Sequence, residues 1–212
     1  MLKINEIYYS IQGESTKAGL PCVFIRLTFC NLRCSYCDSE YAFYDGNELS
    51  IDDIMQEVRK YNCSLVEITG GEPLFQEESL ALMKHLADNG FEVLLETGGS
   101  LPVKNIDPRV KIIMDLKTPS SGMLKKNLYD NLNDLKGIDE VKFVIGSRED
   151  YLWSKQILDK YSIDKKNVVL FSIVFGKLLP LELVNWILED NLNVRFQLQM
   201  HKFIWKPDER GV

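Results

Sequence analysis

Residues 23–37, VFIRLTFCNLRCSYC, join a short apolar run to a polar loop that holds three cysteines. The run at 23–28 is rich in β-branched and aromatic residues, which predicts a buried strand. Six further runs of this kind follow, at residues 65–69, 91–97, 111–116, 141–145, 168–174 and 194–199. Near-continuous apolar runs are typical of parallel strands that are covered on both faces. The sequence therefore predicts a largely parallel sheet whose first strand leads directly into the cysteine loop.

Amphipathic stretches of helical period separate these runs. Ser50 followed by Asp53 predicts a helix start, with an apolar stripe over 51–58. Further helices are expected at 77–89, 124–135, 148–161 and 181–190, whereas 98–109 carries two prolines and predicts a crossover with little or no helix. Such alternation predicts an α/β fold of βαβ units. About six units are too few for an eight-fold barrel of about 250 residues, which leaves a partial (βα) barrel or an open sheet.

The composition limits the classes of protein and of binding partner that fit this chain. The 212 residues are 45% apolar and carry 25 Lys and Arg against 31 Asp and Glu, a net charge of −6. One globular domain fits this length, and an acidic chain favours a small-molecule partner over nucleic acid. No run is long enough to span a membrane, and the first ten residues lack the apolar core of a signal peptide, so we expect a cytoplasmic protein with reduced cysteines.

Three of the five cysteines, Cys30, Cys34 and Cys37, form the pattern C-x3-C-x2-C. A packed apolar trio is disfavoured because the intervening residues are mostly polar. A structural zinc site needs four ligands, and no other cysteine or histidine is spaced as an obvious fourth. Three soft thiolates in one loop favour a [4Fe-4S] cluster with one iron left open to bind a substrate. Those other candidates are Cys22, on the near side of the strand, and Cys63, His85 and His201; we expect the two cysteines among them to be buried and inert.

Polar and glycine motifs follow three other strands: residues 69–72 (TGGE), 96–98 (ETG) and 115–117 (DLK). In parallel α/β folds, function lies at these carboxyl ends. The glycines would let a ligand approach the backbone, and Glu72 would accept from an ammonium. Each candidate also has a purely structural alternative: residues 69–72 could form an ordinary turn between strand and helix, and Glu96 could be a turn residue exposed to solvent. Ser172, on the run 168–174, is a weaker candidate for a ligand contact, and its alternative is a hydroxyl bonded within the sheet. Arg26 interrupts an apolar strand and needs an anionic partner, either Glu6, Glu14 or a substrate carboxylate.

With the aromatic Tyr36 before its last cysteine, the loop resembles the signature of radical S-adenosylmethionine (SAM) enzymes. The resemblance implies a complete or partial βα barrel and a [4Fe-4S] cluster. It also implies an open iron that chelates SAM and a 5′-deoxyadenosyl radical released from it. Radical chemistry of this kind belongs to the cofactor, while the protein supplies binding and orientation.

Three further stretches narrow the resemblance: SIQGE at 10–14, the pattern G-x-P-x-x-F-I-R-L at 19–27, and the tail at 199–212. Together with the cysteine loop they are similar to the 7-carboxy-7-deazaguanine synthase family over residues 5–212. Members convert 6-carboxy-5,6,7,8-tetrahydropterin to 7-carboxy-7-deazaguanine, a step toward queuosine and other 7-deazapurines. The resemblance implies hydrogen abstraction at C6, radical ring contraction and ammonia loss, with SAM used catalytically. It also implies Mg²⁺, a homodimer and an electron donor such as flavodoxin or ferredoxin.

The roles that the resemblance assigns to matching positions of this sequence cover one radical SAM domain, residues 1–212. Its parts are a substrate-binding segment at 1–22, a cluster and Mg²⁺ loop at 30–39, and a tail at 200–212 that closes the substrate site. His201 would add proton handling, with simple packing of the tail as the alternative. Ser39 would bind Mg²⁺. The resemblance assigns the cluster to Cys30, Cys34 and Cys37; SAM to Tyr36, Cys37, Asp38, Gly70, Gly71, Glu72, Glu96, Asp115, Leu116, Lys117, Ser172, Ile173, Val174 and Phe175; and the pterin to Ile11, Gln12, Gly13, Glu14, Arg26, Thr69, His201 and Val212.

The chain departs from the family pattern at three positions. Ser15 and Phe29 stand where glycine is common, and Ser39 replaces a usual threonine but keeps the hydroxyl. Two rival classes remain open: a glycyl-radical-enzyme activase that acts on a protein, and a metal-stabilised binding protein without catalysis.

Overall fold

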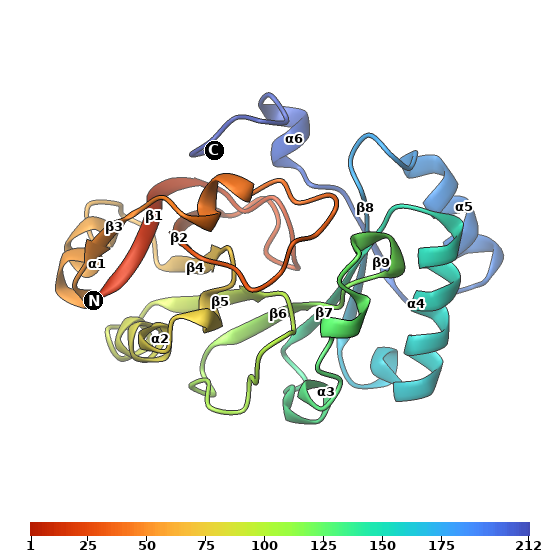
Figure 1. Ribbon diagram of the computed structural model, residues 1–212, viewed down its shortest axis with the longest axis horizontal. Coiled ribbons are helices and arrows are strands. Elements are labelled where there is room, and N and C mark those ends of the chain that lie inside the picture. The colour runs from red at the N-terminus through yellow and green to blue at the C-terminus, as the bar shows by residue number, and fades with distance from the viewer.

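The computed structural model describes residues 1–212 and contains a single open sheet of nine strands. The sheet order is β3-β1-β2-β4-β5-β6-β7-β8-β9. Neighbours from β2 to β9 pair in parallel, whereas β1 and β3 are antiparallel. The sheet curls without closing, which confirms the partial (βα) barrel (Figure 1). The strands are β1 (Leu2–Ile11), β2 (Pro21–Leu27), β3 (Asn47–Leu49), β4 (Leu65–Gly70), β5 (Glu92–Thr97), β6 (Lys111–Asp115), β7 (Glu140–Ile145), β8 (Val168–Ile173) and β9 (Arg195–Gln197).

The helices are α1 (Ile51–Val58), α2 (Glu78–Asp88), α3 (Asn131–Asp134), α4 (Arg148–Tyr161), α5 (Pro180–Glu189) and α6 (His201–Ile204), with 3-10 turns at Glu40–Phe43, Pro73–Phe75, Pro119–Ser121, Leu124–Lys126 and Ile163–Lys165. All except α6, which belongs to the C-terminal tail, lie along the outside of this curl (Figure 1). Ser50 and Asp53 form the capping box that starts α1, as the sequence predicts. The predictions at 77–89, 148–161 and 181–190 are confirmed by α2, α4 and α5, and 98–109 has no helix.

Two expectations are wrong. The N-terminal segment was expected to precede the first strand, but it forms β1, whose polar residues alternate with apolar ones because only one side of this antiparallel strand is well buried. The helix expected at 124–135 is only a 3-10 turn and the single turn α3. Asn127 bonds the backbone of Lys117 through both of its amide atoms, and Asn131 donates to the Gly99 and Leu101 carbonyls. Asparagine side chains that bond distant backbone in this way compete with a continuous helix.

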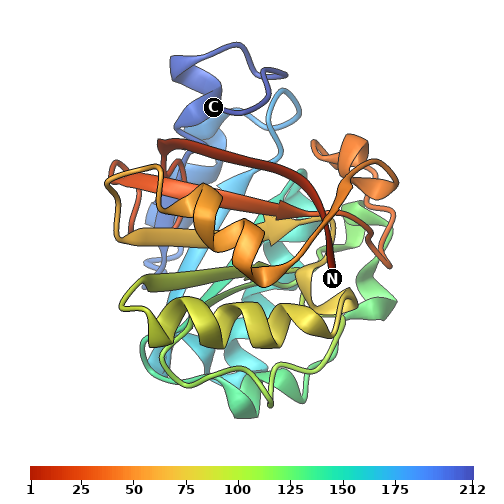
Figure 2. The ribbon, with the colours of Figure 1, turned by 90° about the vertical axis from the view of Figure 1, so that its left-hand side faces the viewer.

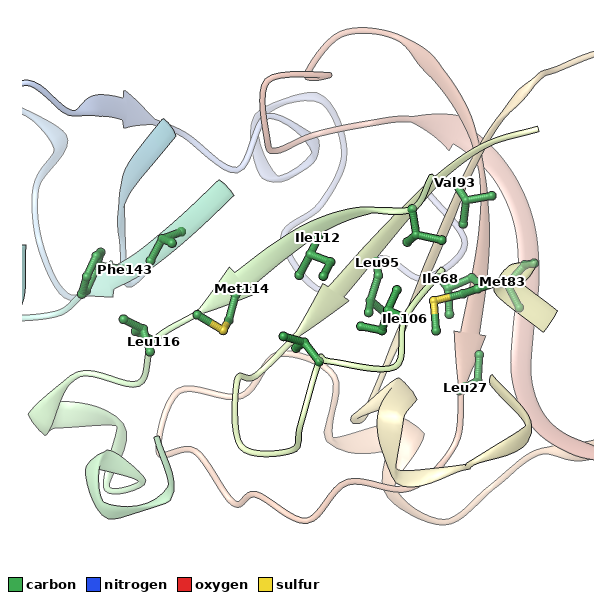
Figure 3. Close-up of a cluster of buried hydrophobic side chains, with 14 of the residues drawn as sticks. Leu27, Ile68, Met83, Val93, Leu95, Ile106, Ile112, Met114, Leu116 and Phe143 are labelled. Carbon is green, nitrogen blue, oxygen red and sulfur yellow. The ribbon is translucent and has the colours of Figure 1, made fainter. Parts of the chain in front are cut away.

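The main hydrophobic core lies between the sheet and the helices. Val23, Ile25 and Leu27 of β2 belong to it, as do the side chains of β4 to β7 shown in Figure 3. Because side chains alternate along a strand, the intervening residues point to the inner face. A second, smaller cluster of six buried residues, including Phe24 and Leu94, covers part of that face. The rest of the inner face carries charged side chains. None of the helices is both long and apolar enough to cross a membrane.

The β1–β2 loop, residues 12–20, reaches the far edge of the open sheet. Two bonds close the loop, from Gln12 N–H to the Leu20 carbonyl (2.8 Å) and from Gly19 N–H to the Gln12 carbonyl (2.8 Å). On the far edge, the Gln197 amide of β9 donates to the Ser15 carbonyl (3.0 Å), and Thr16 bonds Glu140 of β7. The loop therefore bridges the first and last strands of the sheet.

Both positions where the family has glycine adopt left-handed backbone, with φ of 62° at Ser15 and 75° at Phe29. At Phe29 this conformation is held by two backbone bonds. Its N–H donates to the Ala42 carbonyl (3.0 Å) and its carbonyl accepts from Glu72 N–H (2.8 Å). A residue with a Cβ pays a steric cost there that glycine avoids.

We expect Phe29→Gly to be more stable than Phe29→Ala by about 1 kcal/mol, because both variants lose the ring but only Ala keeps the Cβ strain. Urea denaturation of both proteins measures the difference. An Ala variant as stable as the Gly variant would show that the backbone at residue 29 is unstrained.

Candidate active site

A cavity of about 890 Å³ opens on the inner face, at the carboxyl ends of the parallel strands. Its wall combines the β1–β2 loop, the cysteine loop, the strand ends and the C-terminal tail. The structure thus brings together residues that are up to 200 positions apart in sequence. The cavity is lined by all of the predicted site residues except Glu72, Leu116 and Ser172.

Those three residues lie behind the wall. The Glu72 carboxylate accepts from Thr97 Oγ1 (2.8 Å), Gly98 N–H (2.7 Å) and Leu74 N–H (3.1 Å), so it ties the β4 and β5 loops together. Leu116 is fully buried in the main core. Ser172 is also buried, and its hydroxyl has no partner, so the alternative of a hydroxyl satisfied within the sheet is wrong.

The three loop cysteines, Cys30, Cys34 and Cys37, are half-buried free thiols on the cavity wall. The loop is fixed to the far side of the barrel, because Ser35 N–H donates to the Ser121 carbonyl (3.0 Å) and Ser35 Oγ to that of Ser120 (2.6 Å). Burial raises the pKa of all three thiols. Iron binding requires thiolates and therefore releases these protons.

The other two cysteines have no part in this wall. Cys22 is buried within β2, as expected. Cys63 is only half-buried, and its thiol donates to the Pro21 carbonyl at 3.3 Å. Three soft donors in one loop, separate from the rest, fit the ligand set of a [4Fe-4S] cluster.

The glycine motif at the end of β4 packs directly against the cysteine loop. A Cβ on Gly71 would lie 2.0 Å from the Phe29 carbonyl oxygen, and one on Gly70, where φ is 144°, would lie 2.2 Å from that of Leu27. Both positions therefore need glycine for the fold itself, besides any close approach to a ligand that the sequence suggests.

One end of the cavity carries an unsatisfied acceptor. Lys117 Nζ lies 2.9 Å from Asp115 Oδ2, while Asp115 Oδ1 is buried without a partner. Burial alone would lower the pKa of Lys117, but the Asp115 carboxylate outweighs it and raises that pKa. Tyr36 lies nearby, with its hydroxyl 3.4 Å from Thr118 Oγ1. A fixed cation and an orphaned carboxylate oxygen fit a zwitterionic, hydroxyl-bearing ligand such as SAM.

At the other end, Arg26 finds the structural partner that the sequence suggests. Its Nε donates to Glu6 Oε1 (2.7 Å) and its Nη2 to the Tyr8 hydroxyl (2.9 Å). Burial raises the pKa of Tyr8 to about 12, so this hydroxyl stays protonated. Nη1 of Arg26 makes no hydrogen bond within the chain, which leaves both of its N–H groups for an anionic group in the cavity.

The cavity floor holds charged residues that the sequence analysis did not single out. Lys142 of β7 is buried, and its Nζ lies 2.9 Å from both Glu14 Oε2 and Glu96 Oε1. Glu96 is therefore paired with a cation and is not the solvated turn residue offered as an alternative. Burial opposes ionisation of Glu14 and Lys142, yet their mutual attraction lowers the pKa of Glu14 and raises that of Lys142.

A third carboxyl group, Glu67 of β4, lies in the same floor and accepts from the Gln12 amide. Both Glu67 and Lys142 interrupt apolar strand runs, at 65–69 and 141–145. The same signal that marked Arg26, a charge within a buried strand, was available for them.

The C-terminal tail lies next to β1 (Figure 2), and its residues 201–202 and 207–212 line the cavity. Lys202 Nζ lies 2.7 Å from Asp38 Oδ2, and the Arg210 guanidinium lies 3.9 Å from the centre of the Tyr41 ring. Asp38 in turn accepts from Ser39 Oγ at 3.0 Å. His201 lies against Gly13, and burial lowers its pKa, so its imidazole is neutral at pH 7.

Comparisons with known proteins agree with this geometry. The model of the Radical SAM superfamily matches residues 24–177. A 7-carboxy-7-deazaguanine synthase from Chlorobaculum tepidum is 48% identical over 100% of this chain and 97% of its own length. One from Koribacter versatilis is 45% identical over the full length of both chains. Among solved structures, QueE from Escherichia coli superposes with a TM-score of 0.78 over 94% of each chain at 24% identity, which shows a shared fold.

We expect Lys142→Met to destabilise the protein by about 3 kcal/mol near neutral pH, because Glu14 and Glu96 lose their buried cation. The pKa of both carboxyl groups then rises above the unfolded value, so the variant is most stable in acid and weakens as pH increases. Urea denaturation at about pH 5 and about pH 8 tests this, because the deficit relative to wild type should grow with pH.

The double variant Lys142→Met with Glu96→Gln is the matched control. Removing one of the two carboxylates that lack a cation should restore part of the lost free energy of unfolding. A Lys142→Met protein that unfolds like wild type at both pH values would mean that the lysine does not stabilise the fold.

Proposed function

Because the chain belongs to the Radical SAM superfamily and to the 7-carboxy-7-deazaguanine synthases within it, we propose that the central cavity binds SAM and a carboxypterin side by side. The protein is a radical SAM enzyme that converts 6-carboxy-5,6,7,8-tetrahydropterin to 7-carboxy-7-deazaguanine. Hydrogen abstraction at C6, ring contraction and loss of ammonia make it a carbon–nitrogen lyase of 7-deazapurine biosynthesis. It uses a [4Fe-4S] cluster, SAM and a reductant.

The residue assignment rests on two separate groups of contacts in the cavity wall. Lys117 pairs with Asp115 beside Cys34 and Tyr36, whereas Arg26 pairs with Glu6 and Tyr8. When bound, the cluster and SAM supply a 5′-deoxyadenosyl radical, as radical chemistry of this class requires. The protein's own part is to orient both ligands and to exclude water.

At the cluster end, Cys30, Cys34 and Cys37 would hold the iron. The Lys117 ammonium and the free Asp115 oxygen would bind the carboxylate and the ammonium or hydroxyl groups of SAM. Further contacts with SAM would come from the wall residues Tyr36, Asp38, Gly70, Gly71, Glu96, Ile173, Val174 and Phe175.

At the pterin end, the free Nη1 of Arg26 would bind the substrate carboxylate, because Glu6 and Tyr8 already fix the rest of the guanidinium. The neutral imidazole of His201 would accept or pass on a proton beside the ring. Further contacts would come from Ile11, Gln12, Gly13, Glu14, Thr69 and the C-terminal residue Val212, all of which line the cavity. Ser39 would bind Mg²⁺ with its hydroxyl, next to the Asp38 carboxylate.

Anaerobic incubation of the reconstituted protein with SAM, dithionite, Mg²⁺ and the carboxypterin tests the proposal. We expect 7-carboxy-7-deazaguanine with SAM recovered unchanged. If 5′-deoxyadenosine accumulates without the deazapurine, the radical class stands but the substrate is wrong. Installation of a radical on a polypeptide would instead favour an activase.

Two single cysteine variants separate cluster ligands from the rest. We expect Cys34→Ala to lose the bound iron and its visible charge-transfer band, because only three thiolates face the cavity. Cys63→Ala is the control, since its thiol bonds the Pro21 carbonyl outside the cavity. Equal iron content in the two variants would remove Cys34 from the cluster site.

We also propose that a second copy of the chain packs on α5. The exposed side of this helix presents Leu181 and Leu188, at 68% and 67% exposure, with Leu179 just before it at 66%. Light scattering should give twice the chain mass for wild type and a monomer for Leu181→Lys with Leu188→Lys. A wild-type monomer would refute the dimer. The electron donor is proposed to be a flavodoxin or ferredoxin.

A further inference from the structure

The cavity floor contains more carboxyl groups than cations. Glu14, Glu67 and Glu96 meet there, and Lys142 is their only cationic contact. Lys142 touches Glu14 and Glu96 but not Glu67, whose only hydrogen bond comes from the neutral Gln12 amide. Glu67 is 4% exposed. A buried carboxylate without a cation is costly, so this geometry favours the protonated acid.

The orientation of the Gln12 amide shows which oxygen of Glu67 is free. Gln12 Oε1 accepts from Glu14 N–H at 2.9 Å, which turns Nε2 toward Glu67 Oε2. Glu67 Oε1 has no partner in the chain and is not among the fully enclosed polar atoms. Since Glu67 lines the cavity, Oε1 faces it. A proton on this oxygen gives the floor a hydrogen-bond donor directed at the bound ligand.

The substrate needs such a donor. The pyrimidine edge of a pterin presents two donors, the 2-amino group and N3–H, followed by one acceptor, the 4-oxo oxygen. Glu14 and Glu96 can accept from the donors but repel the oxygen. Two of the three protons of Lys142 are already held by those carboxylates, and one of the two Gln12 amide protons is held by Glu67.

We propose that Glu67 is a specificity-determining residue that remains a neutral carboxylic acid and donates a hydrogen bond to the 4-oxo oxygen of the pterin. The inference rests on the proposed function, because it takes the carboxypterin as the ligand. It adds a role for a residue on β4, two positions before Thr69. The neighbouring charges support it, because burial first, and then Glu96 and Glu14, raise the pKa of Glu67 well above its usual value.

The other titratable groups around Glu67 behave differently near neutral pH. The pKa of Tyr8 on β1 is raised to about 12, that of Cys22 on β2 is also raised, and that of Lys142 on β7 is well above its usual value. The pKa of Glu14 is lowered. Burial raises the pKa of Glu96, and the Lys142 ammonium opposes that rise. Among the three carboxyl groups of the floor, Glu67 is therefore expected to keep its proton to the highest pH.

Equilibrium binding of the carboxypterin to the reconstituted holoenzyme with SAM and without reductant tests the proposal. Wild type should lose about tenfold in affinity as the pH is raised through the pKa of Glu67, because the ionised carboxylate no longer donates. Glu67→Gln keeps a donor that cannot be lost, so its affinity should be reduced by less than about threefold at pH 7 and should not fall further with pH. Glu67→Leu removes the donor and should bind about tenfold more weakly at every pH.

A pterin with a 4-amino group in place of the 4-oxo group provides a second probe. Wild type should prefer the 4-oxo compound, and Glu67→Leu should weaken this preference by about tenfold; the part that remains reflects N3, which carries no proton in the 4-amino compound. The exposed Glu78→Gln on α2 controls for the general effect of removing a charge.

A loss of about tenfold or more in Glu67→Gln at pH 7 would overturn the proposal, because it would mean that the ionised carboxylate is needed. Wild-type affinity in Glu67→Leu would overturn it as well. Product formation by wild type tests the proposed function separately, so failure of the two can be told apart.

Discussion

The buried contact of Lys142 with Glu14 and Glu96 is the interaction on which the site depends. The sheet is open, and the three residues come from β7, from the β1–β2 loop and from β5. One ammonium therefore holds the N-terminal loop inside the barrel, across the side that the strands leave open. The loop brings Gln12 and Gly13 to the cavity, and the tail is then placed by the bond from Met200 N–H to the Gly13 carbonyl (3.0 Å). Without this cation the loop would carry an uncompensated charge into the interior.

The cluster end is built on backbone geometry. Phe29 adopts a left-handed conformation, and its carbonyl packs where a Cβ on Gly71 would lie. The cysteine loop and the glycine motif therefore fix each other's positions, and Glu72 extends the connection to the β5 loop through Gly98. Strain of this kind persists when the surrounding structure determines it, and it is often found at functional sites.

Charge is arranged differently at the two ends of the cavity. Near the cysteines, a fixed ammonium on Lys117 and a free oxygen on Asp115 suit a charged cosubstrate. In the floor, one lysine pairs with two of the three carboxyl groups and the third bonds a neutral amide, which suits a neutral heterocycle with several N–H donors. Part of the protein's formal net charge of −6 therefore comes from carboxyl groups inside the binding site.

The sequence by itself determined the family and the parallel strands, and it predicts the cluster ligands, because these depend on local patterns. Each apolar strand run, each helical apolar stripe and the spacing of Cys30, Cys34 and Cys37 is contained in one short segment of the sequence. The sequence did not reveal that Glu72 is used within the fold or that Glu67 and Lys142 form the cavity floor. It also missed β1, whose burial depends on an antiparallel partner. A charge within an apolar run marks such a residue in the sequence, but which residues meet across the curled sheet is decided only by the tertiary structure, because the partner of a buried charge lies far away in the chain.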